Sequence, residues 1–227
     1  MDIAMLPLGQ IARDIPGATA VLHKLKLDFC CGGAVSLKDA ADKKGLDINS
    51  IVASIQARSE HQSSELNPAE AATEELIEHI LSRFHDVHRE QLPELIRLSK
   101  RVERVHGGHP ECPAGLAAEL EAMMKQLEHH MSREEQILFP MIARGVEGLA
   151  IIPVSVMREE HDNHGAALDR IYKITNNIRL PADACNTWTA LYQGLGVFRD
   201  DLMEHIHLEN NVLFNRIDGQ MGGAQRY

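Results

Sequence analysis

The sequence predicts an all-α protein in which a small helical domain precedes an antiparallel four-helix bundle. Of its 227 residues, 44% are hydrophobic but only 4% are aromatic. Leu, Ile, Ala and Met supply most of the apolar content, a mixture that suits helices better than sheets. Apolar residues recur at three- and four-residue spacing, and no segment alternates as a strand would. The breaks between the long apolar stretches are short, as antiparallel neighbours in a bundle require.

Composition divides the chain into three parts. Residues 1–58 predict a small domain with a helix around residues 17–26, a second that Ser36 begins and Gly45 ends, and a third that opens at Asp47. Residues 59–72 are polar, contain a proline and predict a linker. Residues 73–218 predict the bundle, with long helices expected at residues 73–106, 114–144, 153–177 and 181–216.

Charge and targeting signals narrow the class of function. The chain carries 23 basic and 33 acidic residues, a net charge of −10 that disfavours binding to nucleic acid. The N-terminus has no basic segment followed by an apolar run, and no apolar stretch reaches the ~20 residues of a membrane span. Four cysteines are too few for a disulfide scaffold. We therefore expect a cytoplasmic protein with no membrane partner.

Histidine pairs with glutamate at helical spacing on two of the expected helices. A His and a Glu four residues apart lie on one helix face, where both can reach a metal. With 13 histidines and 33 acidic residues, chance alone supplies roughly two such pairs, and the sequence has three. His61/Glu65 falls in the polar linker and is set aside. His130/Glu134 and His205/Glu209 instead complete apolar stripes, formed by Leu120, Met124, Leu127, Ile137 and Met141 and by Leu191, Leu195, Phe198, Leu202, Val212 and Leu213.

An internal repeat makes these pairs specific. The segment FHDVH, residues 84–88, resembles EHDNH, residues 160–164, at an offset of 76. HMSRE, residues 130–134, resembles HIHLE, residues 205–209, at an offset of 75. Two helical hairpins with the same layout would bring ligands from four helices to one level. Buried ionisable side chains are costly unless they are paired or bind metal, so the repeat predicts a metal site.

The ligand types indicate which metal binds. Imidazole and carboxylate without thiolate favour iron, manganese or zinc over copper(I). If both glutamates bridge two metals, each metal receives four protein donors, and an oxo or hydroxo bridge would leave about one open position on each. Such a centre can react with oxygen, nitric oxide or peroxide. Spacing alone leaves open whether His85 or His88, and whether His161 or His164, is the ligand.

The same residues resemble a known family. The bundle resembles the hemerythrin-like domain, and nearly the whole chain resembles the YtfE/ScdA family of iron–sulfur cluster repair di-iron proteins. The motifs that carry this resemblance are DFCCGG at residues 28–33, FHDVHREQLPEL at 84–95, HHMSREEQILFPMI at 129–142, SVMREEHD at 155–162 and HIHLENNVLF at 205–214.

The resemblance implies a ligand set and a role. It implies that residues 1–58 are similar to the N-terminal domain of ScdA. It implies two non-haem iron ions held by His85, His130, His161 and His205, with Glu134 and Glu209 as bridges. It also implies repair of iron–sulfur clusters damaged by oxidative or nitrosative stress, with the damaged proteins as partners. His129 and His207 fall off the apolar face and are expected to be solvated, whereas His23, His79, His106 and His109 have no repeat partner.

Alternative functions remain open from the sequence. A hemerythrin-like carrier or sensor of oxygen or nitric oxide is one, and a purely structural bundle is another. Oxygen-carrying hemerythrins place a further histidine on the third helix where this chain has Gly165, which disfavours reversible oxygen storage. The sequence does not decide whether the centre donates iron or reduces nitric oxide as an enzyme, nor whether the chain forms a homodimer.

The adjacent Cys30 and Cys31 are candidate catalytic residues. Two glycines follow them and allow a close approach of backbone and ligand. One interpretation is a thiolate pair that binds iron or nitric oxide or receives an intermediate from the metal centre. The other is two small buried residues at a turn. Adjacent cysteines form a disulfide only with distorted geometry. Cys112 and Cys185 lack a comparable context and are expected to be inert.

Overall fold

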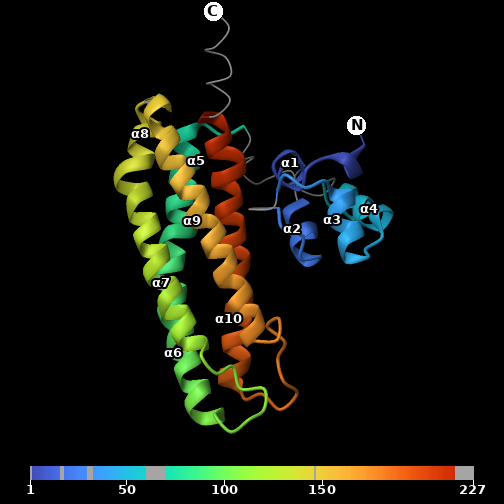
Figure 1. Ribbon diagram of the computed structural model, residues 1–227, viewed down its shortest axis with the longest axis vertical. Helices are drawn as coiled ribbons and strands as arrows, with labels where there is room; N and C mark the ends of the chain where they lie inside the picture. The colour runs from blue at the N-terminus through green and yellow to red at the C-terminus, as the bar shows by residue number, and fades with distance from the viewer. Residues whose placement is uncertain (1, 16–17, 30–32, 60–69, 146, 218–227) are drawn as a thin grey trace, which may run out of the picture. The chain divides into compact units, whose positions relative to one another are not determined.

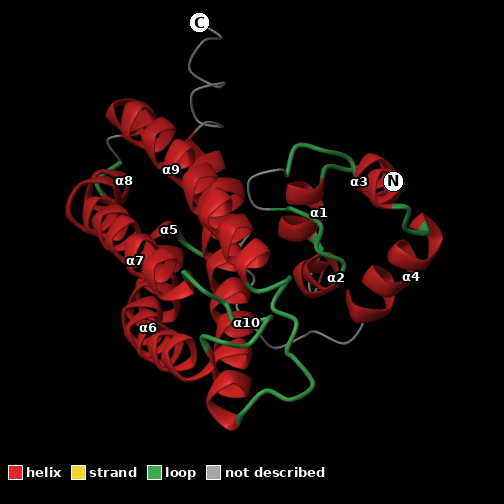
Figure 2. Cartoon of the chain, turned by 60° about the horizontal axis from the view of Figure 1, so that its bottom comes forward, coloured by secondary structure: helices red, strands yellow, loops and turns green. Residues whose placement is uncertain are grey.

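A computed structural model describes residues 2–15, 18–29, 33–59, 70–145 and 147–217 of the chain. The described residues form helices and connecting loops, and none of them belongs to a β-strand (Figure 2). The predicted all-α class is therefore confirmed. Among the same residues, every helix is too short or too polar to span a lipid bilayer.

The chain folds into two compact units, one of residues 1–77 and 203–227 and one of residues 78–202. The N-terminal helices of the first unit are η1 (Ile3–Met5, a 3₁₀ turn), α1 (Leu8–Asp14), α2 (Ala18–Lys24), α3 (Leu37–Lys44) and α4 (Ile48–Ser59). Their inner faces share a core that includes Leu22, Phe29 and Ile55, each almost completely buried. This burial stabilises helices that are individually too short to persist in water.

The third N-terminal helix has the ends that its sequence predicts. The Ser36 hydroxyl accepts a hydrogen bond from the Asp39 amide at 3.1 Å and caps the start of α3. Gly45 ends the helix at a φ of 64°, in the left-handed region that glycine enters at least cost. Helix α1, by contrast, was not predicted. Burial of Leu8 and Ile11 stabilises this short helix. The amides of Leu8 and Gly9 at its start donate to the carbonyls of Val35 and Gly33, both at 2.9 Å.

The bundle elements follow the expected order with shifted boundaries. They are α5 (Thr73–Ile80), η2 (Leu81–His85), α6 (Asp86–His106), α7 (Leu116–Arg133), η3 (Glu134–Leu138), α8 (Phe139–Ala143), α9 (Glu147–Ile174), α10 (Asn186–His207) and η4 (Leu208–Leu213). The third long helix begins at residue 147 and not at 153, so Pro153 lies inside it. The fourth begins at residue 186 and not at 181, because residues 181–184 form a turn in which Ala184 N–H donates to the Pro181 carbonyl.

Within residues 78–202 the long helices pack side by side (Figure 1). Helix α6 packs against α7, and α7 packs against α9. Asp201 of α10 accepts hydrogen bonds from Arg83 and Gln91, both at 2.6 Å. A Cβ on Gly194 of α10 would lie 2.9 Å from the Leu95 side chain of α6, so these two helices approach closely. These contacts form the four-helix bundle that the sequence predicts.

Three of the long helices contain a π-helical segment, which the sequence did not predict. These are η2, η3 and η4, and each includes one of the predicted metal ligands, namely His85, Glu134 and Glu209. A π-helical turn contains an extra residue and so rotates everything that follows it. Ile137, expected on the apolar stripe, is consequently 51% exposed, whereas the next residue, Leu138, is 1% exposed. The expectation for Ile137 was wrong for this reason.

The expectation that His207 is solvated was also wrong. Its side chain is 1% exposed and packs edge-on against Phe29 of the first unit, with ring centroids 5.4 Å apart. Burial lowers the pKa of His207 to about 4, even though hydrogen bonds with the backbone of Phe29 and Ala12 oppose the shift. The helical pattern places His207 away from the bundle's apolar stripe, but a second apolar surface covers it there. His129, in contrast, is exposed as expected.

Candidate metal centre

Each of the two predicted His–Glu pairs lies on a single helix face and is buried. His130 Nε2 and a Glu134 oxygen are 3.3 Å apart, and the two side chains are 1% and 0% exposed. His205 Nε2 and a Glu209 oxygen are 3.1 Å apart, with side chains that are also 1% and 0% exposed. The prediction that four-residue spacing places His and Glu on one buried face is confirmed. Neither carboxylate is placed where water can solvate it.

Glu134 receives two imidazoles from different helices. His130 Nε2 approaches one carboxylate oxygen of Glu134. His85 Nε2 lies 3.6 Å from the other oxygen. Neither oxygen of Glu134 accepts a hydrogen bond from any described residue. An ionised carboxylate in such a site has a large desolvation cost unless a positive charge compensates it. The side chain therefore has the environment of a metal-binding carboxylate, with bare oxygens facing imidazole nitrogens.

His161 brings a third imidazole to the same place. Its Nε2 lies 3.0 Å from Nε2 of His130, and the two rings meet edge to face with centroids 4.7 Å apart. Two imidazole nitrogens that converge on one point are typical of ligands that share or flank a metal ion.

The ligand atoms form two overlapping groups of four. One group joins His85, Glu134, His205 and Glu209, and the other joins His130, Glu134, His161 and Glu209. Within each group the ligand atoms lie within 4.8 Å of one another, and all the side chains are buried. Glu134 and Glu209 belong to both groups, as would be expected of carboxylates shared between two metal ions. Imidazoles and carboxylates without a thiolate fit iron, manganese or zinc.

The imidazoles are oriented by carboxylates that sequence reasoning missed. His85 Nδ1 lies 2.8 Å from Glu135, and His130 Nδ1 lies 2.9 Å from Glu160. A carboxylate bound to Nδ1 favours the tautomer that carries its proton there, which leaves the Nε2 lone pair available to a metal. The sequence does place an acidic residue next to a predicted ligand in both cases, since Glu135 follows Glu134 and Glu160 precedes His161. Spacing alone, however, does not show which acidic neighbour points toward an imidazole.

Arginines hold both of these outer carboxylates. Arg89 donates to Glu135 at 2.9 Å and forms a two-bond pair with Glu128, and Arg133 contacts Glu160. Burial raises the pKa of Glu160, but hydrogen bonds from His130 and Arg133 outweigh burial and lower that pKa below its ordinary value. Glu160 is therefore ionised at neutral pH and accepts the Nδ1 proton of His130.

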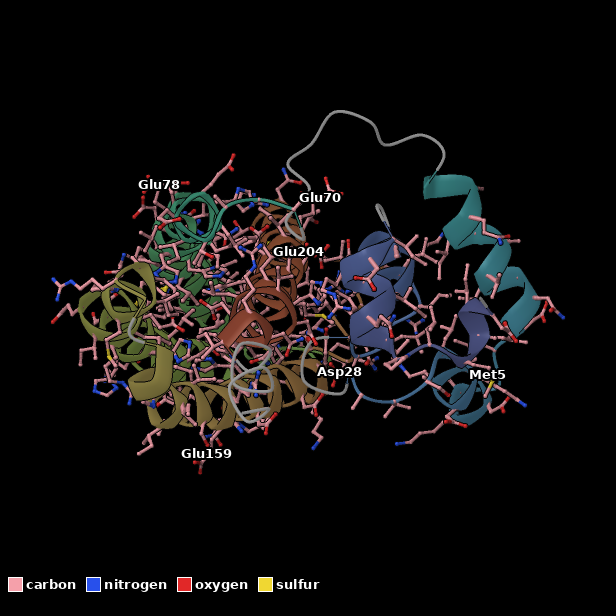
Figure 3. The ribbon with its side chains drawn as sticks, turned by 90° about the horizontal axis from the view of Figure 1, so that it is seen from above. Met5, Asp28, Glu70, Glu78, Glu159 and Glu204 are labelled. Carbon is pink, nitrogen blue, oxygen red and sulfur yellow. The ribbon has the colours of Figure 1, made fainter. Side chains whose placement is uncertain are left out.

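Glu159 and Glu160 show how one residue of helical rotation separates two roles. Glu159 is exposed and points away from the bundle (Figure 3). Glu160 is half-buried and reaches His130. The two side chains have the same chemistry, so their difference in function is set by their position around α9.

The alternative histidines of the repeat are buried as well. His88 is 0% and His164 is 2% exposed. His164 packs edge-on against His130, with centroids 4.9 Å apart, and His88 packs against Phe198 of α10 at 5.5 Å. Neither belongs to the two groups of converging ligand atoms found in the described part of the chain. They pack beside the centre.

The remaining predicted site residues lie outside the described structure. Cys30 and Cys31 fall in residues 30–32, and the discounted pair His61/Glu65 falls in residues 60–69, two of the ranges for which no placement is given.

The chain is similar to known proteins over nearly its full length. The hemerythrin HHE cation binding domain matches residues 76–217, and the ScdA_N domain, a domain of unknown function (DUF542), matches residues 6–59. The chain is 52% identical over 217 residues to the iron–sulfur cluster repair protein YtfE of Yersinia pseudotuberculosis serotype O:1b, which covers 95% of this chain and 98% of that protein. The protein of the same name from Yersinia pestis strain Pestoides F matches to the same extent.

Proposed function

The chain belongs to the hemerythrin-like family of iron–sulfur cluster repair proteins, and on that basis we propose that it repairs iron–sulfur clusters damaged by oxidative or nitrosative stress. Its partners are then proteins that carry such damaged clusters, in the cytoplasm. The near full-length similarity supports this role, because both the bundle and the N-terminal domain are shared with the relatives. The single observation that carries the proposal is the buried group of imidazoles and carboxylates around Glu134.

We propose that this group holds two iron ions. His85, His130, His161 and His205 supply nitrogen ligands, and Glu134 and Glu209 bridge, with an oxo or hydroxo group completing the pair. The bare, buried oxygens of Glu134 support this assignment, since a dication offsets the charge that the protein leaves uncompensated. When bound, the pair supplies redox chemistry toward nitric oxide or oxygen and a source of iron for a cluster that has lost it.

The surrounding residues prepare the site for that chemistry. Glu135 and Glu160 hold the Nδ1 protons of His85 and His130, so both Nε2 atoms present lone pairs without rearrangement. Arg89 contacts Glu135 and Arg133 contacts Glu160, so each carboxylate is held in place beside its imidazole. Complete burial of Glu134 and His161 excludes bulk water. The protein thus contributes ligand orientation and a dry site.

We further propose that the two domains of the chain have different roles. Residues 1–58 form a domain whose Cys30 and Cys31 thiolates bind iron or nitric oxide, residues 59–72 link it, and residues 73–218 carry the metal centre. The match of one family model to residues 6–59 and another to residues 76–217 supports two domains. The net charge of −10 argues against nucleic acid as a partner.

The test combines iron analysis with a repair assay. Purified wild-type protein is expected to contain about two irons per chain and to restore, under anaerobic conditions, the activity of a cluster enzyme damaged by nitric oxide. Glu134→Gln keeps the shape of the side chain but removes its charge, and it should lose both iron and repair. Glu159→Gln, on the outer surface, is the matched control and should retain both.

Iron-free wild-type protein, or full repair by Glu134→Gln, would reject the proposal. A reversible spectral change with nitric oxide and no recovery of the enzyme would indicate sensing instead.

A further inference from the structure

A second group of histidines lies at the other end of α6, around the only tryptophan of the chain. The rings of His106 and His109 pack against Trp188 of α10, with centroids 5.0 and 5.3 Å away. His109 also pairs with Asp183 at 3.2 Å. This group is separate from the proposed iron centre. It lies about 30 Å away, since His85 and His106 occupy opposite ends of a helical run of some twenty residues.

A cysteine and a histidine meet in this group. His106 Nε2 lies 3.1 Å from the Sγ atom of Cys185, although the two residues are 79 positions apart in the sequence. Cys185 is exposed, so small molecules can reach its sulfur. Contact with the Trp188 indole fixes the plane of the His106 ring. A thiol within hydrogen-bond distance of an oriented imidazole has the arrangement of an activated nucleophile and its base.

A cavity opens beside the pair and provides space for a reactant. Its volume is about 370 Å³. Apolar side chains form part of its wall, and Arg101 adds a positive charge. The lining residues are Arg101, Val102, Val105, His106, Cys185, Asn186 and Thr187. The cavity therefore suits a small molecule that has both an apolar part and a negative charge.

The same place is not arranged to bind a metal. Among the described residues, converging groups of three or more metal-ligand atoms occur around Glu134 and Glu209, and neither Cys185 nor His106 belongs to one. The thiol sulfur of Cys185 and Nε2 of His106 instead lie at hydrogen-bond distance beside an open cavity. This arrangement favours transfer of a proton from the thiol to the imidazole.

From this arrangement we propose that Cys185 is a site of reversible thiol–disulfide exchange with a small anionic disulfide. As Sγ of Cys185 bonds to one sulfur of the disulfide, its proton passes to His106 Nε2 and the sulfur–sulfur bond of the reactant breaks. The departing thiolate takes the proton back from His106 and leaves as a thiol. The protein thiol is oxidised to a mixed disulfide, and the small disulfide is the oxidant. Arg101 binds a carboxylate of the reactant.

Cys112 provides an internal reference for this reactivity. It lies in the same end of the bundle and is also free, but it is less exposed than Cys185. Burial and the neighbouring Glu103 carboxylate both raise the pKa of the Cys112 thiol, so less of it is thiolate at neutral pH. Because both cysteines are in the same molecule and the same reaction mixture, a difference between their reaction rates reports on their surroundings.

The first experiment measures mixed-disulfide formation at each cysteine of the full-length protein. The protein is incubated with oxidised glutathione, quenched at intervals with acid and analysed by peptide mass spectrometry, which separates Cys185 and Cys112 from the paired Cys30 and Cys31. We expect Cys185 to react about tenfold faster than Cys112 or more. Cys185→Ser should remove only the adduct at that position. Equal rates at Cys185 and Cys112 would overturn the proposal, and this comparison needs no variant that might fold poorly.

The second experiment tests the roles of the neighbours. His106→Asn keeps a polar side chain but no base, and it should slow the reaction of Cys185 about tenfold. Arg101→Gln should slow the reaction with oxidised glutathione but not with the neutral hydroxyethyl disulfide, whereas Arg97→Gln, on the same helix and paired with Glu94, should change neither. An unchanged rate in His106→Asn, or equal effects of Arg101→Gln on both disulfides, would contradict the proposed base or the proposed anion site. Iron content and repair are assayed in parallel and should be unaffected, which separates this site from the proposed function.

Discussion

Histidines cluster at both ends of the bundle, but their surroundings differ and so does the chemistry that they can support. Around Glu134 the imidazoles are buried, their Nδ1 atoms contact carboxylates held by arginines, and their Nε2 atoms converge. Around Trp188 the imidazoles are partly exposed and contact an indole, a thiol and a surface carboxylate. Both clusters use histidines of the same helical run, from His85 to His106.

This difference shows that burial and the partner of the second nitrogen decide what a histidine does. A carboxylate on Nδ1 fixes the tautomer and directs the other nitrogen to a metal. A thiol partner instead makes the imidazole a proton acceptor. Substitutions in the two clusters should therefore affect different measurable properties.

The largest effect is expected from removal of a buried imidazole. His130→Ala leaves Glu134 and Glu160 without their partner, and it should lower the free energy of unfolding by about 3–5 kcal/mol and release most of the iron. Elemental analysis and chemical denaturation measure the two outcomes. The neighbouring His129→Ala, at an exposed position, is the control and should change neither. If His130→Ala kept its full iron content, the proposed ligand set would be incorrect.

A smaller, pH-dependent effect is expected at His207, which is buried without a carboxylate. Its pKa is about 4 in the folded chain against an ordinary value of 6.5, so between these values the unfolded chain binds more protons. Stability should therefore fall as the pH drops from 6.5 to 4, with a contribution from His207 of roughly 3 kcal/mol. Denaturant titrations of wild type and His207→Gln across this pH range measure the contribution. Loss of metal at low pH affects both proteins, so the difference between them reports on His207 alone. Identical pH dependence in the two proteins would show that His207 is not the responsible group.

The outer carboxylate should have an intermediate effect on metal binding. Glu160→Gln retains the size of the side chain but weakens its hold on the Nδ1 proton of His130, and we expect iron affinity to fall by about 10- to 100-fold. Competition with a chelator measures the affinity. Glu159→Gln provides the matched control on the outer face of α9. Equal affinities for the two variants would mean that the contact between Glu160 and His130 does not tune the metal.

The smallest effect is expected at the surface cluster. His109→Gln removes an exposed pair with Asp183, and such pairs contribute less than about 1 kcal/mol to stability. Iron content should stay at the wild-type value, while the fluorescence of Trp188 should change because His109 packs on its ring. Iron loss in this variant would remove the distinction between the two ends of the bundle.

The sequence alone predicted the class of fold and much of the candidate site. Its repeat at an offset of 75–76 identified His130/Glu134 and His205/Glu209, because helical spacing and an apolar stripe are local properties of a sequence. The resemblance to a family then selected among the paired histidines. The caps of α3 at Ser36 and Gly45 were likewise predicted, since helix ends depend on hydrogen bonds between near neighbours.

Only the tertiary structure decided which side chains meet. The π-helical segments moved Ile137 to the surface, the turns of α7 and α9 brought Glu160 to His130, and helix packing placed Cys185 beside His106. The periodicity of a single helix states which residues share a face, but not how far a neighbouring helix is rotated or displaced along its axis. For that reason helical spacing determined that His130 and Glu134, like His205 and Glu209, share one face of a helix, whereas the fold determined which side chains lie next to them.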